Sequence, residues 1–200
     1  KAGAFLTADF AVKDRDRSKR QVRVFFRLPL QLTKVMVLSV RITERFRPYE
    51  EILRYRTGAR CDLDWSSSGL SARYGPSDKP AWKIRGRLEG LLCRSLAGLA
   101  YLEGGRKTDW FSAYLRGTIF IVDDWDDRIY SYERDAPGNF TVPAYYGRGW
   151  SLSAVSGCKL RLGRGRALKL YFRASTMAYS FMKEPKPSVS EAKVQAVVTF

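Results

Sequence analysis

Apolar and polar residues alternate with a period of two through much of this chain, and the alternation limits the folds that the chain can adopt. The clearest case is residues 192–200, where the apolar phase begins at Ala192 and ends on Phe200, while the other phase is mostly polar. Successive side chains of a β-strand point to opposite faces, so this pattern predicts a strand with one apolar face and one mostly polar face.

Earlier segments repeat the pattern and predict a chain made almost entirely of strands. The alternating segments are residues 3–12, 21–28, 35–46, 57–65, 82–89, 111–121, 150–162, 168–179 and 192–200. Glycine-containing residues 104–107 and 163–166 predict tight turns, and the proline-containing residues 183–190 predict a longer loop. Residues 66–79 are ambiguous. We expect ten to twelve antiparallel strands in one domain that spans residues 1–200.

The face that meets water distinguishes a membrane barrel from a soluble β-sandwich or lipocalin-like barrel, and alternation alone does not identify that face. A strand of about 10 residues tilted by about 40° spans ~25 Å, which matches the apolar band of an outer-membrane barrel. Short turns on one side and longer loops on the other are typical of such barrels. The chain has no run of about 18 apolar residues, which a transmembrane helix would need. We therefore expect an all-β, antiparallel transmembrane β-barrel, alone or as part of a larger one.

Aromatic residues at strand ends fit the same fold. Phe200 lies at the apolar phase of the last strand, and it resembles the terminal aromatic by which outer-membrane barrels are recognised for insertion. Trp65, Trp82, Trp110 and Trp150 lie near the ends of predicted strands. They are candidates for the aromatic girdle at the membrane boundary, the alternative being ordinary core tryptophans. With a periplasmic carboxy terminus, the predicted loop would be external and the turn 163–166 periplasmic.

Charge and reactive residues narrow the function classes. The chain has 36 Lys and Arg against 20 Asp and Glu, a formal net charge of +16. This surplus suggests an anionic partner such as nucleic acid, anionic lipid or lipopolysaccharide phosphates. The chain has no His, and its three Cys form no CxxC motif, so Ser-His-Asp and Cys-His catalysis and the common zinc and redox motifs are excluded. We expect a protein that is not an enzyme and that needs no cofactor.

The polar phase of the predicted strands carries basic residues that would face the lumen of a barrel. Charges there must be hydrated or paired. One interpretation is an aqueous channel for anions. The other, which we favour, is a narrow closed interior in which salt bridges hold the barrel rigid. The acidic residues of this phase are Asp62, Asp64 and Glu89. The basic ones are Arg23, Arg27, Arg60, Arg85, Arg87, Arg116, Lys159, Arg161, Lys169 and Arg173.

Two stretches outside the strands are candidates for binding. One is a cluster of four aspartates: Asp123, Asp124, Asp126 and Asp127. The cluster could bind Ca²⁺, but its spacing is not that of an EF-hand loop, and we favour carboxylates that are solvated or paired with Arg128 and Arg148. The other stretch, residues 143–149, predicts an inward plug or partner-binding loop, or a loop that needs glycine angles to re-enter a strand. Both interpretations stay open.

Residues 126–133 (DDRIYSYE) and 140–149 (FTVPAYYGRG) together resemble a block near the carboxy terminus of the helix-hairpin-helix outer-membrane proteins of the Bacteroidetes group. The resemblance covers residues 111–200 well and the earlier half loosely. It implies a barrel that ends on an aromatic residue, preceded in that family by helix-hairpin-helix units that are not found in this sequence. The candidate loop or partner residues are Asp126, Asp127, Arg128, Tyr130, Tyr132, Glu133, Pro143, Tyr145, Tyr146, Gly147, Arg148 and Gly149.

The sequence thus predicts an outer-membrane barrel that serves as a structural or scaffold subunit of a cell-envelope assembly. Its expected partners are outer-membrane lipid, lipopolysaccharide and other envelope proteins or lipoproteins. The alternatives are a small anion-preferring pore and the membrane anchor of a nucleic-acid-binding helix-hairpin-helix protein. A nucleic-acid-binding module follows from charge alone, and we do not favour it because the basic residues alternate along strands instead of clustering on a helix or loop.

Overall fold

The computed structural model describes the backbone of residues 7–14, 20–33, 36–49, 52–66, 81–163, 166–182 and 186–199, and side chains from residue 58 onward. Phe200 lies outside the described residues, as do the side chains of Arg23 and Arg27. The strands are β1 (Thr7–Asp14), β2 (Arg20–Thr33), β3 (Met36–Tyr49), β4 (Ile52–Ser66), β5 (Ala81–Leu92), β6 (Leu96–Lys107), β7 (Phe111–Val122), β8 (Ile129–Tyr130), β9 (Ala144–Tyr145), β10 (Gly147–Gly163), β11 (Arg166–Ala178) and β12 (Val189–Thr199). A 3-10 turn, η1 (Trp125–Asp127), is the helical element of this part of the chain.

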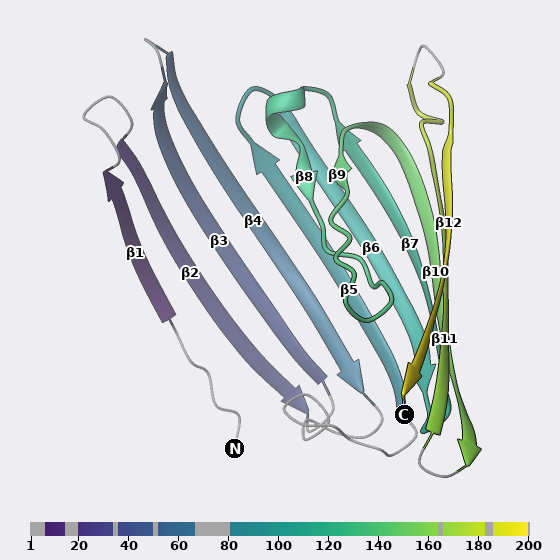
Figure 1. Cartoon of the computed structure of the whole chain (residues 1–200). Coiled ribbons are helices and arrows are strands. Elements are labelled where there is room, and N and C mark those ends of the chain that lie inside the picture. The colour runs from purple at the N-terminus through teal and green to yellow at the C-terminus, as the bar shows by residue number, and fades with distance from the viewer. Residues whose placement is uncertain are drawn as a thin grey trace.

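Ten strands form one antiparallel sheet in which neighbours along the chain are neighbours in space, in the order β1-β2-β3-β4-β5-β6-β7-β10-β11-β12 (Figure 1). The connection between β7 and β10 carries η1 and the small sheet β8–β9. The prediction of an all-β antiparallel fold is confirmed. Within the described residues, no helix is long and apolar enough to cross a membrane.

The sheet has two chemically opposite faces. The register sets Glu103 of β6 opposite Arg116 of β7, with Ser153 of β10 next in the same row, on the face that we call inner. Leu102 and Leu115, each one position away along its strand, point to the outer face. Glu103 is 2% exposed and Arg116 3%, whereas Leu102 is 61% exposed and Leu115 54%. Charges are therefore buried and apolar side chains exposed, the reverse of the usual arrangement in a soluble sheet.

The exposed apolar surface continues across the outer face of six strands. It consists of Trp82, Ile84, Leu88, Leu102, Leu115, Ile119, Ile121, Trp150, Leu152, Leu160, Leu170, Phe172, Val194 and Val198. Because these residues share one phase of the alternation, they form one broad patch instead of scattered single residues.

The small buried core forms on the inner face, where the β7–β10 connection folds back over the sheet. Phe120 of β7 and Tyr145 of β9 are both buried, with ring centroids 5.1 Å apart. The other buried members of this cluster are Leu91, Ala97, Leu99, Val122 and Ile129. The chain thus builds its core between the sheet and one of its own connections, not between two sheets.

The prediction of a tight turn at residues 104–107 is wrong, because these residues lie inside β6. The turn comes after Lys107, where the Thr108 hydroxyl and backbone N–H both donate to the Phe111 carbonyl. Gly105 is paired with Tyr114, and a Cβ on Gly105 would lie 2.2 Å from the Tyr114 ring. The glycine therefore makes room for an aromatic ring within a strand and does not bend the chain.

The long described connections lie at one end of the sheet and the carboxy terminus at the other. The β7–β10 and β11–β12 connections are at the upper end in Figure 1, and the end of β12 is at the lower end. Trp82 and Trp110 lie toward the lower end and Trp150 toward the upper end, and all three are exposed. Residues 67–80 lie outside the described residues.

The two edges of the sheet do not meet. In the described residues, β1 pairs only with β2, and β12 pairs only with β11. The sheet is therefore open, and the predicted closed barrel is not seen within these residues.

Candidate functional site

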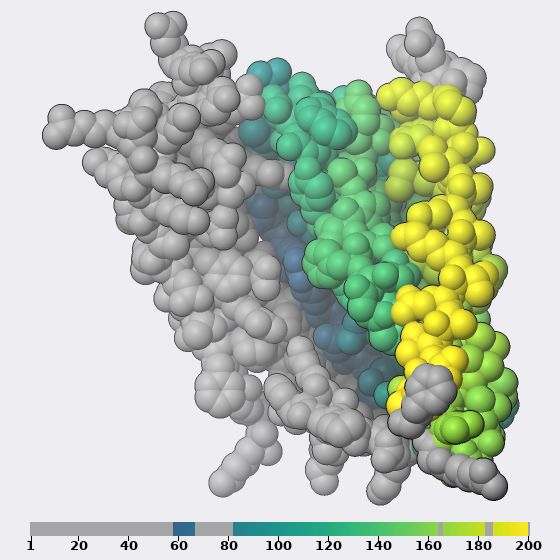
Figure 2. Space-filling view, in the orientation of Figure 1, coloured from purple at the N-terminus to yellow at the C-terminus, as the bar shows by residue number. Residues whose placement is uncertain are grey.

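Residues 123–146, which we call the captured segment, run from the upper end down the inner face and return (Figure 1). Locally, the Asp124 carboxylate caps η1 by accepting from the Asp126 N–H at 2.9 Å. Farther along, Glu133 bridges to Thr141, and Gly138, with φ of +87°, turns the chain back. Figure 2 shows this segment lying in the hollow of the sheet.

Alternation continues in the descending limb of the captured segment and decides which side chains meet the sheet. Ile129, Ser131 and Glu133 are buried, whereas Tyr130 and Tyr132 are about half exposed. The limb is extended, so every second residue points to the inner face and the others point away from it.

Glu103 forms the first clamp on the captured segment. It accepts from Arg116 Nη2 at 2.7 Å and Nε at 3.1 Å, and from Arg134 Nε of the captured segment at 2.5 Å. Arg116 also donates to the Tyr132 carbonyl at 2.6 Å. Because the Glu103 and Arg116 side chains are only 3% and 4% exposed, this cluster relies on its own members for hydrogen bonds.

Glu133 forms the second clamp, with the carboxylate now on the captured segment. It accepts from Arg173 Nη2 of β11 at 2.7 Å and from the Tyr145 hydroxyl at 2.5 Å. Arg173 also donates to Glu191 of β12 at 2.9 Å. In both clamps a carboxylate joins the sheet to the captured segment. The carboxylate belongs to the sheet in the first clamp (Glu103) and to the captured segment in the second (Glu133).

Asp127 forms a third clamp at the upper end. Its buried carboxylate accepts from the Ser95 N–H at 2.7 Å, the Ser95 hydroxyl at 2.9 Å and the Arg94 N–H at 3.2 Å. Ser95 and Arg94 lie in the turn between β5 and β6. The carboxylate thus satisfies backbone donors of a turn that would otherwise lack partners.

The remaining aspartates of the cluster are paired at the upper end. Asp123 accepts from Arg148 at 2.5 Å, and Arg94 lies 3.2 Å from Asp126 and 3.8 Å from Asp124. Arg128, expected to pair with an aspartate, has its guanidinium over the Trp125 ring and donates to the Tyr130 hydroxyl. No group of three His, Cys, Asp or Glu in the described residues could hold a metal ion.

Titration of the captured segment follows its surroundings. Burial, followed by the nearby Glu133, raises the pKa of Tyr145 from its ordinary value to about 12. Burial would raise the pKa of Asp135, but hydrogen bonds from Thr141 and the Ala136 N–H, together with Lys193, outweigh it and lower that pKa. At neutral pH the Tyr145 hydroxyl therefore stays a donor and the Asp135 carboxylate stays ionised.

The predicted lumen-facing basic residues from β4 onward all fall on the inner face, but their surroundings differ. Arg60 and Arg87 share Asp62, each at 2.7 Å, and Arg85 lies 3.2 Å from Asp64. Arg116 and Arg173 belong to the clamps described above. The register puts the other three, Lys159, Arg161 and Lys169, in the lower rows of the same face.

The loop candidates divide between two elements. Asp126 to Tyr146 belong to the captured segment, whereas Gly147, Arg148 and Gly149 begin β10. The Pro143 carbonyl accepts from the Ser131 N–H at 3.3 Å, which holds the two limbs together. Gly147 has a φ of +89°, and a Cβ on Gly149 would collide with the Ala178 carbonyl. Residues 143–145 thus belong to the captured segment, and the glycine positions lie where the chain enters β10.

Sequence reasoning missed Glu103, Arg134 and Ser95, which hold the captured segment. Glu103 lies next to the glycines that predict a turn at residues 104–107. Its phase within β6 would have marked it as inward-facing had that strand been predicted. Nothing in the local sequence of Ser95 signals its bond to Asp127, 32 residues away.

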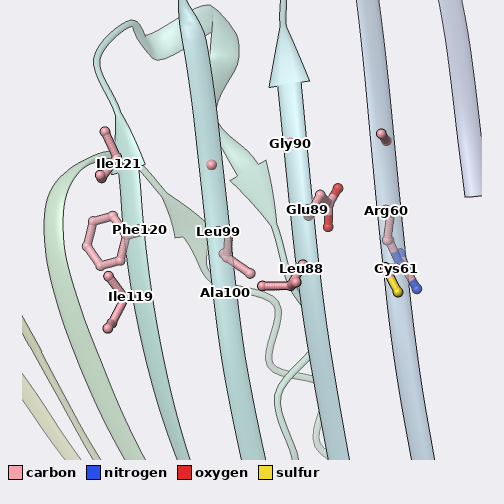
Figure 3. A pocket seen from close by; sticks show the side chains of 12 residues that line it. Arg60, Cys61, Leu88, Glu89, Gly90, Leu99, Ala100, Ile119, Phe120 and Ile121 are labelled. Carbon is pink, nitrogen blue, oxygen red and sulfur yellow. The ribbon is translucent and has the colours of Figure 1, made fainter. Parts of the chain in front are cut away.

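The outer face carries a shallow apolar groove along β5, β6 and β7. Leu88, Ala100 and Ile119 line it together with Gly90 and Gly98, and its volume is about 510 Å³ (Figure 3). Small residues in the middle and larger ones at the sides produce the groove. It lies within the exposed apolar patch, and its lining also includes Arg60, Cys61 and Glu89.

No known family model, curated protein or solved structure matches this chain. The resemblance to helix-hairpin-helix outer-membrane proteins therefore stays a prediction that rests on residues 126–133 and 140–149.

Proposed function

We propose that this chain forms a β-barrel in the bacterial outer membrane and serves there as a structural subunit of a cell-envelope assembly, without catalysis. The observation that carries the proposal is the inverted polarity of the sheet. Its outer face exposes Leu102, Leu115 and Ile119, while its inner face buries Glu103 and Arg116. A continuous apolar surface of this extent fits a face that meets hydrocarbon.

Contact with lipid would also account for the groove on the outer face. Acyl chains can fill the space above Gly90, Gly98 and Ala100, which have little side chain of their own. Trp82 and Trp110 toward one end, and Trp150 toward the other, would then lie near the two headgroup regions.

A bilayer requires the open edges of the sheet to be paired. Backbone N–H and C=O groups left unpaired in hydrocarbon cost several kcal/mol each, roughly, so a lipid-exposed edge is not stable. Pairing of β1 with β12 would close a barrel of the ten strands, and a larger barrel would use further strands at the same edges.

We favour a closed interior over an open anion-preferring pore. The captured segment lies on the inner face between β5 and β12 and is held there by three buried carboxylates, Glu103, Asp127 and Glu133. The lumen of a barrel of this size is small and readily filled by side chains. The surplus of basic residues supports the pore as the second candidate, and conductance separates the two.

The resemblance to helix-hairpin-helix outer-membrane proteins supports the proposed location, and it also leaves a role as the membrane anchor of such a protein as an alternative. On either proposal the upper end faces outside and the lower end faces the periplasm. Lipopolysaccharide and envelope proteins or lipoproteins would be the neighbours of the barrel.

The proposal is tested by locating the full chain in fractionated cells and running it on gels with and without heating. We expect it in the outer membrane, with an unheated form that migrates differently, because a closed barrel resists detergent until heated. Leu115→Lys should reduce the assembled form, since Lys on the lipid face near the midplane costs about 2–4 kcal/mol. Phe140→Lys is the matched control, because Phe140 is 80% exposed but belongs to the captured segment.

Recovery of the wild-type chain as a soluble monomer without detergent would contradict the proposal. Equal loss of assembly in the Leu115→Lys and Phe140→Lys variants would also contradict it, because the outer face would then have no special role.

A further inference from the structure

Three basic side chains lie together on the inner face at its lower end, in the rows below the contacts between the captured segment and β12. We call this group the basic end. Its members are Lys159 and Arg161 of β10, and Lys169 of β11. None of them forms an ion pair with a carboxylate of the described residues, whereas the arginines farther up this face do.

The captured segment stops short of the basic end. Near its tip, the Pro137 carbonyl accepts from Gln195 Nε2 of β12 at 3.1 Å, and Asn139 Nδ2 donates to Gln195 Oε1 at 3.0 Å. Gln195 is paired with Tyr171, and Lys169 is one row lower on the same face. The captured segment is therefore bonded to the inner face as far as Gln195, and none of the hydrogen bonds and ion pairs of the described residues joins it to the rows below.

The cations of the basic end oppose one another. Lys159 and Lys169 are direct cross-strand partners, and like charges in such positions destabilise a sheet. Arg161 lies two residues along the same strand and on the same face. Asp109 lies in the β6–β7 turn, and none of the ion pairs among the described residues joins it to these three cations.

The spacing and type of these cations indicate which anion they fit. Lys159 and Arg161 are two residues apart on an extended strand, so their side chains are about 6.6 Å apart along it. Alternate side chains of an extended peptide have the same repeat. Two of the three are lysines, and the basic end thus lacks the arginine clusters that hold phosphates in two-pronged hydrogen bonds. Carboxylates are also the groups that the arginines farther up this face already bind.

We propose that the basic end binds an acidic, extended segment of a partner protein in the envelope assembly. The inference rests on the proposed function, because it takes the lower end as the periplasmic mouth of the barrel. The partner's carboxylates would relieve the repulsion between Lys159 and Lys169. The captured segment shows the same principle within the chain, where an extended limb is held on this face by carboxylate–arginine pairs.

Binding is tested with the full chain in nonionic detergent and a fluorescent peptide in which glutamate alternates with serine. We expect saturable binding that weakens as salt rises, and no binding of the same peptide with glutamine in place of glutamate. Lys159→Glu should weaken binding about tenfold. The same change should keep or raise the resistance to thermal unfolding, because the new carboxylate faces Lys169. Lys186→Glu, at the upper end, is the control and should change the affinity by less than about twofold.

Three results would overturn the inference. They are an absence of peptide binding by the wild-type chain, unchanged binding by Lys159→Glu, and tighter binding of inorganic polyphosphate than of the peptide. Each can be observed while the chain still reaches the outer membrane and shows a heat-modifiable form. Failure of the inference is therefore distinguishable from failure of the proposed function, which shows as loss of membrane location.

Discussion

Glu133 and Arg173 lie 40 residues apart in the chain, yet Arg173 Nη2 donates to Glu133 Oε2 at 2.7 Å inside the molecule. Their side chains are 4% and 3% exposed. One belongs to the captured segment and the other to β11, so this ion pair fixes a connection of the chain against the wall of the sheet. The clamps that hold this segment can each be broken separately.

Breaking the Glu133–Arg173 pair from one side should loosen the captured segment more than removing both charges. Arg173→Met leaves the buried Glu133 carboxylate without a cation, which costs about 3–5 kcal/mol, whereas Glu133→Gln should cost less because Arg173 keeps its pair with Glu191. The double variant should recover part of this loss. Limited proteolysis near Gly138, together with thermal unfolding, measures the coupling. Additive effects of the two single changes would show that the pair does not hold the segment.

The buried Asp127 should contribute more to stability than Asp123, which forms an exposed ion pair at the upper end. Asp127→Ala leaves the donors of Ser95 and Arg94 without an acceptor, which costs about 1–3 kcal/mol. Asp123→Ala is the matched control. It removes a solvent-exposed pair with Arg148 and should cost much less, because water screens exposed charges. Chemical unfolding of both variants gives the comparison, and equal losses would argue against the third clamp.

Alkaline pH should release the captured segment. Since the pKa of Tyr145 is raised from 10.0 to about 12, the folded state favours the protonated hydroxyl. This contribution is fully present below pH 10, and it is lost as the pH rises through about 12. Tyrosinate absorbance, recorded alongside proteolysis near Gly138, follows the release. In Tyr145→Phe the step should disappear, and an unchanged alkaline step would assign it to another group.

Replacing the tip of the captured segment should distinguish a closed barrel from a pore. The wild-type chain should give no steady conductance in planar bilayers. Replacing residues 132–141 with glycine and serine removes Glu133 and Arg134 from the clamps, and we expect anion-preferring steps. Adding Arg85→Glu and Arg87→Glu to that variant should reverse the preference. Steady anion-selective steps from the wild-type chain would instead favour the pore.

The local sequence pattern predicted much of the sheet and the strand arginines that hold the captured segment. Alternation placed Arg116 and Arg173 on the same face before any contact was known, because the phase of a strand depends only on sequence spacing. It failed at Gly104 and Gly105, where two glycines predicted a turn. A glycine in a strand and a glycine in a turn look alike in sequence, and the ring that covers Gly105 belongs to Tyr114 on another strand.

By itself the sequence determined that the chain forms strands and which side chains share a face, since both follow from the two-residue repeat of an extended backbone. Only the tertiary structure decided which of those side chains meet. The Glu103–Arg134 contact joins residues 31 positions apart, and the Glu133–Arg173 contact joins residues 40 apart. These pairs depend on how the β7–β10 connection folds back over the sheet. That packing is set by the shape and charge of distant strands, which no local repeat contains.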